Sequence, residues 1–193
     1  SDWTVARVVR KPYTDRPAPP FTRSTLQQEA NSKLRLSARA TMQAAQRLYE
    51  NGLITSKRTD STTLSSAAIN ASRDAIERLY GKEFVPKEPR LYTTTVKNAQ
   101  EAHEAIRPAE GFQRPEDLRS KLGDREYKVY ELIWKRTMAC QMEDARGHRM
   151  SLKITDGRAV FQASGKTIEF PGYLRAYVEG ADDPDAELAD KEL

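Results

Sequence analysis

Residues 51–63 read Asn-Gly-Leu-Ile-Thr-Ser-Lys-Arg-Thr-Asp-Ser-Thr-Thr, a polar run with a cationic centre and helical patterns on either side. Gly52 closes the preceding helical pattern, and Leu53 and Ile54 can anchor the segment in a core. The polar residues that follow have no apolar interruption, which predicts an exposed loop of the kind that presents a site to a ligand. Hydroxyl, ammonium and guanidinium groups in one loop suit a phosphate, because arginine offers a planar fork of donors. A solvated loop that carries a helix N-cap is the alternative interpretation.

The composition restricts the classes of protein to which the chain can belong. Its 193 residues, 38% of them hydrophobic, predict one domain or two small ones with a lean core. The sequence has no apolar run of membrane-spanning length, and its first residues lack the apolar core of a signal peptide. The single cysteine, Cys140, excludes an internal disulfide and a cysteine-based zinc site, and we expect it to be a small core residue in a helix. We therefore expect no membrane partner and no metal site in this chain.

Positive charge is concentrated in the first third of the chain. The net charge is +4, but residues 1–60 contain 11 lysine and arginine residues against 5 aspartate and glutamate residues. Residues 151–193 contain 5 against 9. Cations clustered beside an exposed loop are typical of nucleic-acid binders, although an ordinary solvated surface is also compatible with this excess.

The chain begins with the pattern of a strand followed by a proline-rich connector. Residues 3–9 alternate in polarity, which predicts a strand that buries Trp3 and Val5 on one face. Residues 16–20 read Arg-Pro-Ala-Pro-Pro, and the restricted backbone of these prolines predicts an extended, semi-rigid connector.

Three helices are predicted on the two sides of the polar loop. Ser24 and Gln27 form the pattern of a capping box at the start of the first helix. The second helix leads into the loop at Gly52, and the third is predicted to start at the N-cap Ser65 and to end at Gly81. The residues expected on the inner faces of the second and third helices are Ala38, Met42, Ala45, Leu48, Tyr49, Ile69, Ile76, Leu79 and Tyr80.

A further short helix is predicted between Asn98, its N-cap, and Pro108. His103 and Arg107 are four residues apart and would share one face of this helix, where an imidazole and a guanidinium together suit a phosphate. The alternative is a packed histidine beside an arginine that caps the helix.

The last third combines a long helix with a β-hairpin. Asp124 is expected to cap a helix over residues 125–142, preceded by a helix start at residues 114–118. Asp156 and Gly157 predict a type I′ hairpin between two alternating strands. The apolar stripe of the long helix consists of Tyr127, Tyr130, Ile133, Trp134, Thr137 and Met138.

The predicted fold class is α+β, with a mainly helical domain inserted into a small antiparallel β module. Ile168 and Phe170 predict a third strand, and because an isolated hairpin is marginal, the N-terminal strand is expected to complete the sheet. The predicted parts are residues 1–20 (strand and connector), 21–146 (helical domain), 147–179 (hairpin) and 180–193 (an acidic, disordered tail).

The order of residues in the polar loop resembles the active-site loop of type IA DNA topoisomerases, most closely that of bacterial topoisomerase I. Ser56 stands where this family has its nucleophilic tyrosine, and Lys57 stands where methionine is usual. Residues 21–28 and 100–108 resemble two further motifs of the family. The loop residues that match are Gly52, Leu53, Ile54, Thr55, Arg58, Thr59, Asp60 and Ser61.

The resemblance implies an enzyme that relaxes negatively supercoiled DNA. Such an enzyme cleaves one strand through a 5′-phosphotyrosyl link, passes another strand and reseals the break without ATP. It implies that this chain is a central fragment of a toroidal protein, with the active-site domain and part of a β hinge. The implied catalytic positions are Ser56, Arg58 and His103, and the implied DNA-binding residues are Lys57, Arg58, Thr59, Ser61, His103 and Arg107.

The resemblance also implies what this chain lacks. In the family, Mg²⁺ is bound by an upstream domain that this sequence does not contain, so the remaining domains of the same polypeptide are expected partners. With Ser56 at the tyrosine position, the chain is expected to bind single-stranded DNA but to be inactive alone. A cytoplasmic, nucleoid-associated bacterial protein is implied. The alternative is a non-catalytic DNA-binding or protein-interaction module on the same scaffold.

Overall fold

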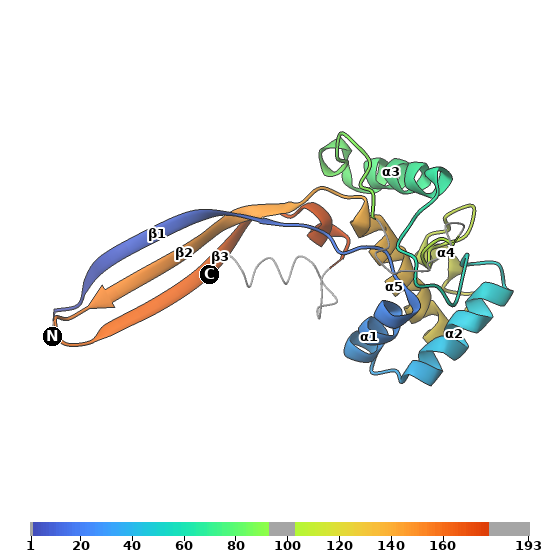
Figure 1. The fold of residues 1–193 in the computed structure, drawn as a ribbon, viewed down its shortest axis with the longest axis horizontal. Helices are drawn as coiled ribbons and strands as arrows, with labels where there is room; N and C mark the ends of the chain where they lie inside the picture. The colour runs from blue at the N-terminus through green and yellow to red at the C-terminus, as the bar shows by residue number, and fades with distance from the viewer. Residues whose placement is uncertain (1, 93–102, 178–193) are drawn as a thin grey trace. The chain divides into compact units, whose positions relative to one another are not determined.

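The computed structural model describes residues 2–92 and 103–177 (Figure 1). The chain forms two compact units, one from both chain ends, Ser1–Arg16 and Asp144–Leu193, and one from Pro17–Glu143. Helices and an antiparallel sheet are both present, so the predicted α+β class is confirmed. The division into four parts at residues 20, 146 and 179 stays a prediction.

The first unit is a three-stranded antiparallel sheet in the order β1-β2-β3. The strands are β1 (Thr4–Asp15), β2 (Ala145–Thr155) and β3 (Val160–Phe170), and a short 3-10 helix, η2 (Gly172–Arg175), follows β3. The N-terminal strand pairs along β2, as predicted. It runs well past residue 9, because its pairing with β2 continues to Asp15 and Ala145.

Two details of the sheet differ from the sequence prediction. Trp3, directly before β1, and Val5, within it, are 44% and 60% exposed rather than buried, and β1 is exposed along nearly its whole length. Residues 168 and 170 belong to the end of β3 and form no separate strand.

The hairpin turn also differs from the two-residue turn that the sequence predicts. Thr155 pairs with Val160, so four residues, 156–159, connect β2 to β3. The Asp156 carboxylate accepts hydrogen bonds from the backbone N–H groups of Arg158 and Ala159, at 2.8 and 2.9 Å. This carboxylate stabilises the longer turn. The predicted acidic tail, residues 180–193, lies outside the described residues.

The second unit is helical. Its helices are α1 (Arg23–Leu34), α2 (Ala38–Glu50), α3 (Ser66–Tyr80), α4 (Pro115–Leu118) and α5 (Asp124–Cys140), and the 3-10 helix η1 (Lys82–Phe84) follows α3. The helix α5 packs against α1, α2, α3 and α4, and Figure 1 shows it among them. All six residues of the predicted stripe on α5 are buried, so this prediction is confirmed.

The ends of the helices follow the sequence with two exceptions. Ser65 caps α3 and Gly81 ends it, as predicted. The first helix is capped by Thr22 rather than Ser24, because Thr22 and Thr25 form the capping box. In the second exception, α5 has Gly123 as N-cap and Asp124 as its first residue, and it ends at Cys140 rather than at residue 142. Of the predicted inner faces, Ala38 and Tyr49 are exposed.

Candidate functional site

The polar loop is fixed at its start by the end of α2. Gly52 has a φ of 72°, a left-handed conformation that glycine adopts without a Cβ clash. The next N–H, that of Leu53, donates to the Leu48 carbonyl at 2.9 Å. Ile54 is 2% exposed and forms an isolated bridge with Pro108. The predicted anchoring of the loop by Ile54 is therefore confirmed.

Residues 103–109 run beside the loop as an extended segment, and this corrects the predicted short helix. The Thr55 N–H donates to the Arg107 carbonyl at 3.0 Å, and the Ala109 N–H donates to the Leu53 carbonyl at 2.8 Å. Ile106 pairs with Phe21 in the same way, at 2.9 Å. Because these long-range partners use the backbone groups that a helix would need, the segment stays extended. The predicted N-cap, Asn98, lies outside the described residues.

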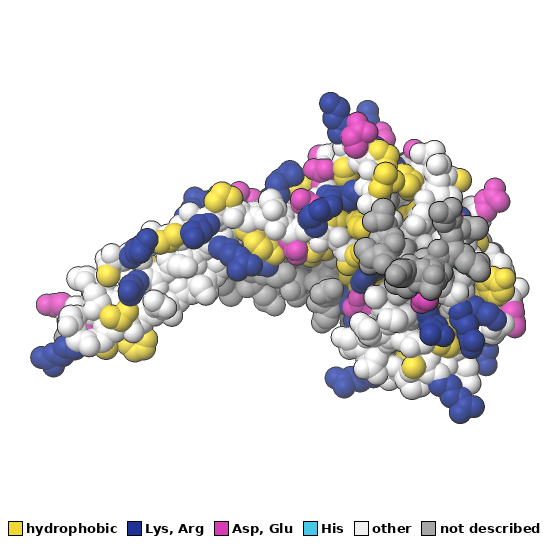
Figure 2. Space-filling model, viewed as in Figure 1, with side chains coloured by type: hydrophobic (Ala, Val, Ile, Leu, Met, Phe, Trp, Pro, Cys, Tyr) yellow, Lys and Arg dark blue, Asp and Glu magenta, His cyan; other side chains and the backbone are white. Residues whose placement is uncertain are grey.

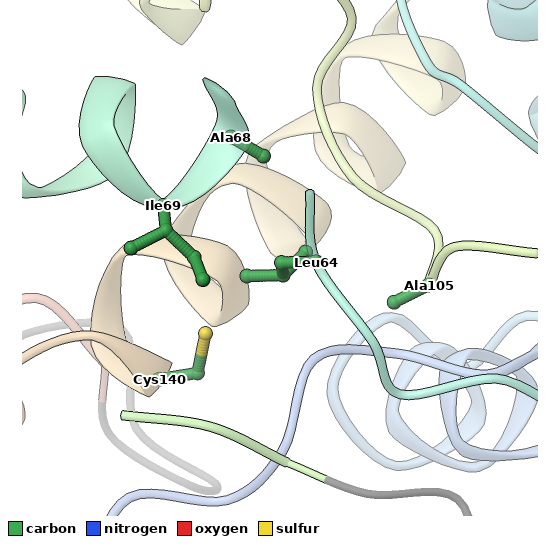
Figure 3. Packing of buried hydrophobic residues seen from close by; sticks show 5 residues of the cluster. All are labelled: Leu64, Ala68, Ile69, Ala105 and Cys140. Carbon is green, nitrogen blue, oxygen red and sulfur yellow. The ribbon is translucent and has the colours of Figure 1, made fainter. Parts of the chain in front are cut away.

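A small apolar cluster holds the far end of the loop (Figure 3). Leu64 packs with Ala68 and Ile69 of α3, with Ala105 of the extended segment and with Cys140 of α5. The Ala105 N–H donates to the Thr63 carbonyl at 2.8 Å. The cluster therefore ties the loop, α3 and the extended segment to α5. The prediction that Cys140 is a core residue is confirmed.

The loop and the extended segment enclose a cavity of about 360 Å³. Four of the predicted site residues, Ser56, Lys57, Arg58 and His103, line it. Three other residues line the cavity that were not predicted from the sequence as site residues, namely Tyr49, Thr55 and Glu104.

The three remaining predicted site residues lie differently. Thr59 and Ser61 are 7% and 4% exposed, and their hydroxyl groups accept hydrogen bonds from the backbone of the loop itself. Their side chains therefore shape the loop. Arg107 is not among the residues that line the cavity.

The two cations of the loop differ in their contacts. The Lys57 ammonium donates a hydrogen bond to the Gln46 side chain and lies 5.5 Å from the centre of the Tyr49 ring. Gln46 and Tyr49 are three residues apart on α2, so one face of this helix holds the lysine. Arg58 is exposed, and in the described ranges its guanidinium has no hydrogen-bond or ion-pair partner. Arg58 is thus available to an anion in the cavity.

Glu104 and Arg107 form an ion pair at the edge of the cavity. The Arg107 Nε and Nη2 donate to the two Glu104 carboxylate oxygens at 3.0 and 2.8 Å. The Ser65 N–H, at the N-cap of α3, donates to the same carboxylate at 2.6 Å. Burial by itself raises the pKa of Glu104, but the hydrogen bonds from Arg107 and Ser65 outweigh it and leave this pKa below its ordinary value. Glu104 is therefore ionised at neutral pH.

One face of the sheet carries a row of cations. Arg7 lies opposite Lys153, and Lys11 lies opposite Arg149, which lies opposite Lys166. Because side chains alternate between the two faces of a sheet, these five residues share one face. A groove of about 510 Å³ is lined in part by Arg7 and Lys153. Figure 2 shows lysine and arginine side chains along this unit.

The described part of the chain contains neither a metal-binding cluster nor a membrane span. No group of three or more histidine, cysteine, aspartate or glutamate residues there could hold a metal ion. None of the helices in residues 2–92 and 103–177 is long and apolar enough to cross a membrane.

The chain is similar to known proteins over almost its whole length. The family described as DNA topoisomerase matches residues 1–192. DNA topoisomerase 1 of Synechococcus elongatus is 56% identical over 99% of this chain, and DNA topoisomerase 1 of Mycolicibacterium smegmatis is 59% identical over 93% of it. The chain spans 22% and 20% of these two relatives.

A solved structure agrees with the sequence comparisons. The full-length topoisomerase I from Thermotoga maritima matches 94% of this chain with a TM-score of 0.78 and 34% sequence identity. The match covers 31% of that protein. Together with the family match, it shows that the chain belongs to the DNA topoisomerase family, as a fragment of a bacterial type IA topoisomerase I.

Proposed function

We propose that this chain is the part of a type IA topoisomerase that binds the scissile phosphate of a single DNA strand. The observation that carries the proposal is the cavity in which Ser56, Lys57, Arg58 and His103 meet. A guanidinium and an imidazole can both donate to the non-bridging oxygens of a phosphate, and an exposed arginine can do so in a bidentate manner. The whole polypeptide would relax negatively supercoiled DNA by strand cleavage, strand passage and religation, without ATP.

The row of cations on the sheet supports DNA as the partner. Five lysine and arginine residues on one face give a positive surface that suits any phosphate backbone without regard to sequence. A protein that holds a DNA strand during a topological change needs such contacts away from the reacting phosphate. This support is independent of the cavity, because the sheet belongs to the other unit of the chain.

The nucleophile and the metal ion set the limits of what this chain does alone. The resemblance implies that Ser56 stands at the position of the attacking tyrosine, and a serine hydroxyl is a weaker acid with a shorter reach than a phenol. The described residues offer no cluster for Mg²⁺. We therefore propose that the metal ion is bound by other domains of the whole polypeptide, and that this chain binds DNA without cleaving it. Ser56 also favours a second candidate, a non-catalytic DNA-binding or protein-interaction module.

Binding of a fluorescent single-stranded oligonucleotide, followed by anisotropy over a series of salt concentrations, tests the proposed site. We expect salt-sensitive binding, in which each neutralised phosphate contributes about 0.7 to the logarithmic salt slope. Arg58→Ala should weaken binding and lower the slope by about that amount. Arg78→Ala, on the exposed side of α3, is the matched control and should change neither. Equal losses in the two variants, or no binding at low salt, would remove the cavity as the DNA site.

A further inference from the structure

The side-chain donors of Arg107 are engaged within the protein. Two of its nitrogens donate to Glu104, and Nη1 donates to the Pro108 carbonyl at 2.9 Å. The Arg107 side chain is 13% exposed and the Glu104 side chain 26%. An arginine held in this bidentate way, close to its own backbone, is not free to turn towards a ligand.

Glu104, in contrast, lines the cavity. A carboxylate on the wall of a phosphate site repels the phosphate unless a nearby cation cancels its charge. Arg107 supplies that cation, and the Ser65 N–H holds the carboxylate from the other side. The pair therefore adds almost no net charge to the cavity, although one member carries a full positive charge four residues from His103.

We propose that Glu104 limits the strength with which the cavity holds a DNA strand, by keeping Arg107 away from the phosphate. Arg107 in turn is a positioning residue that neutralises Glu104 and does not contact DNA. The inference rests on the proposed function, because it concerns the same cavity. A limited affinity for DNA suits an enzyme that must release and move its strand in each cycle. The alternative is the role that the family resemblance implies, in which Arg107 contacts DNA directly.

Three variants test the proposal, and the double variant separates the two roles. In our proposal, Glu104→Gln frees Arg107 to approach the phosphate, so affinity for a single strand at about 50 mM salt should rise about threefold to tenfold. Arg107→Ala leaves an uncancelled carboxylate on the cavity wall and should weaken binding. The double variant removes both charges and should bind within about twofold of the unaltered chain. If Arg107 contacts DNA itself, the double variant should be as weak as Arg107→Ala.

The experiment is a double-mutant cycle in the anisotropy assay, using the whole chain and a labelled single-stranded oligonucleotide. Asp124→Asn, Lys128→Ala and their combination form the control cycle. This exposed pair on α5, at 3.1 Å, does not line the cavity and undergoes the same changes of charge. We expect no coupling in the control. An affinity of Glu104→Gln no higher than that of Asp124→Asn would overturn the proposal.

Thermal unfolding of the same variants separates this role from a structural one. Glu104→Gln keeps an acceptor for the Ser65 N–H but loses the charged pair, so its Tm should fall while its affinity rises. A merely structural residue would lower both, and that result would overturn the inference. Arg58→Ala distinguishes the two proposals. If it does not weaken binding, the proposed function fails. If it does, and the double variant stays weak, the inference alone fails.

Discussion

Burial decides the chemistry of Cys140. Its side chain is fully buried, and its Sγ donates to the Thr137 carbonyl at 3.0 Å. Burial raises the pKa of this thiol to about 12, so almost no thiolate is present at pH 8. Cys140 belongs to the cluster that holds the loop and the segment of His103. Its reactivity therefore reports how often this cluster opens.

We expect Cys140 to resist alkylation by iodoacetamide at pH 8 in the folded chain and to react after unfolding in urea. The reacting species is the thiolate, which burial both disfavours and shields. Ser66→Cys, at an exposed position on α3, provides a reference that should react in the folded state. Mass spectrometry measures the rate at each cysteine. Equal rates at the two positions would show that the cluster is open in solution.

The exposure of Arg58 could be predicted from the sequence, because an uninterrupted polar run has no apolar anchor of its own. The burial of Thr59 and Ser61 could not, because each hydroxyl accepts a backbone hydrogen bond that exists only once the loop has turned. The sequence contains no pattern that predicts Glu104 as a site residue, apart from its place beside His103. Its pairing with Ser65 joins residues 39 positions apart, and local patterns do not report such a contact.

At the scale of single elements, the start of α1 shows how a distant contact selects between two local signals. Both Thr22 with Thr25 and Ser24 with Gln27 have the spacing of a capping box. Phe21 pairs with Ile106, which keeps the chain extended up to residue 21, and the helix begins directly afterwards. The sequence thus predicted the helix, whereas its first residue depended on a partner far along the chain.

Thr22→Ala should lower the free energy of unfolding by about 1 kcal/mol, because it leaves the Thr25 N–H without its capping oxygen at 3.2 Å. Ser24→Ala is the control, since Ser24 lies exposed inside the first turn of α1, and it should change stability by less than about 0.5 kcal/mol. Urea unfolding followed by circular dichroism measures both. A larger loss of stability in Ser24→Ala than in Thr22→Ala would show that Ser24 is the N-cap, as the sequence predicts.

At the scale of the whole molecule, general rules of folding predicted more than local patterns did. The pairing of β1 with the hairpin followed from the weakness of an isolated hairpin, although these strands lie at opposite ends of the chain. The extended course of residues 103–109 was missed, because its partners lie in three separate parts of the sequence. The cavity lies between this segment and the loop. Four of its lining residues could be predicted from the sequence, whereas the extended course of the segment could not.

The last prediction separates a missing nucleophile from missing domains. We expect Ser56→Tyr in this chain alone to form no covalent DNA adduct, because in the proposed function the phenol would still lack the metal ion that other domains of the whole polypeptide bind. In a chimera, the chain with Ser56→Tyr replaces the corresponding segment of the full-length Mycolicibacterium smegmatis relative. This chimera should form the adduct. The same chimera with Ser56 unchanged should not. In-line attack needs the nucleophile and the cations fixed in one geometry, so both deficits must be repaired.

A labelled single-stranded oligonucleotide, incubated with Mg²⁺ and resolved on a denaturing gel, shows the adduct as a protein-linked band. Arg58→Ala in the active chimera is the matched control. It keeps the phenol and the metal ion but removes the exposed cation of the cavity, so the band should weaken. A band from the unmodified chain by itself would make Ser56 a true nucleophile and would contradict the proposal that this fragment binds DNA without cleaving it.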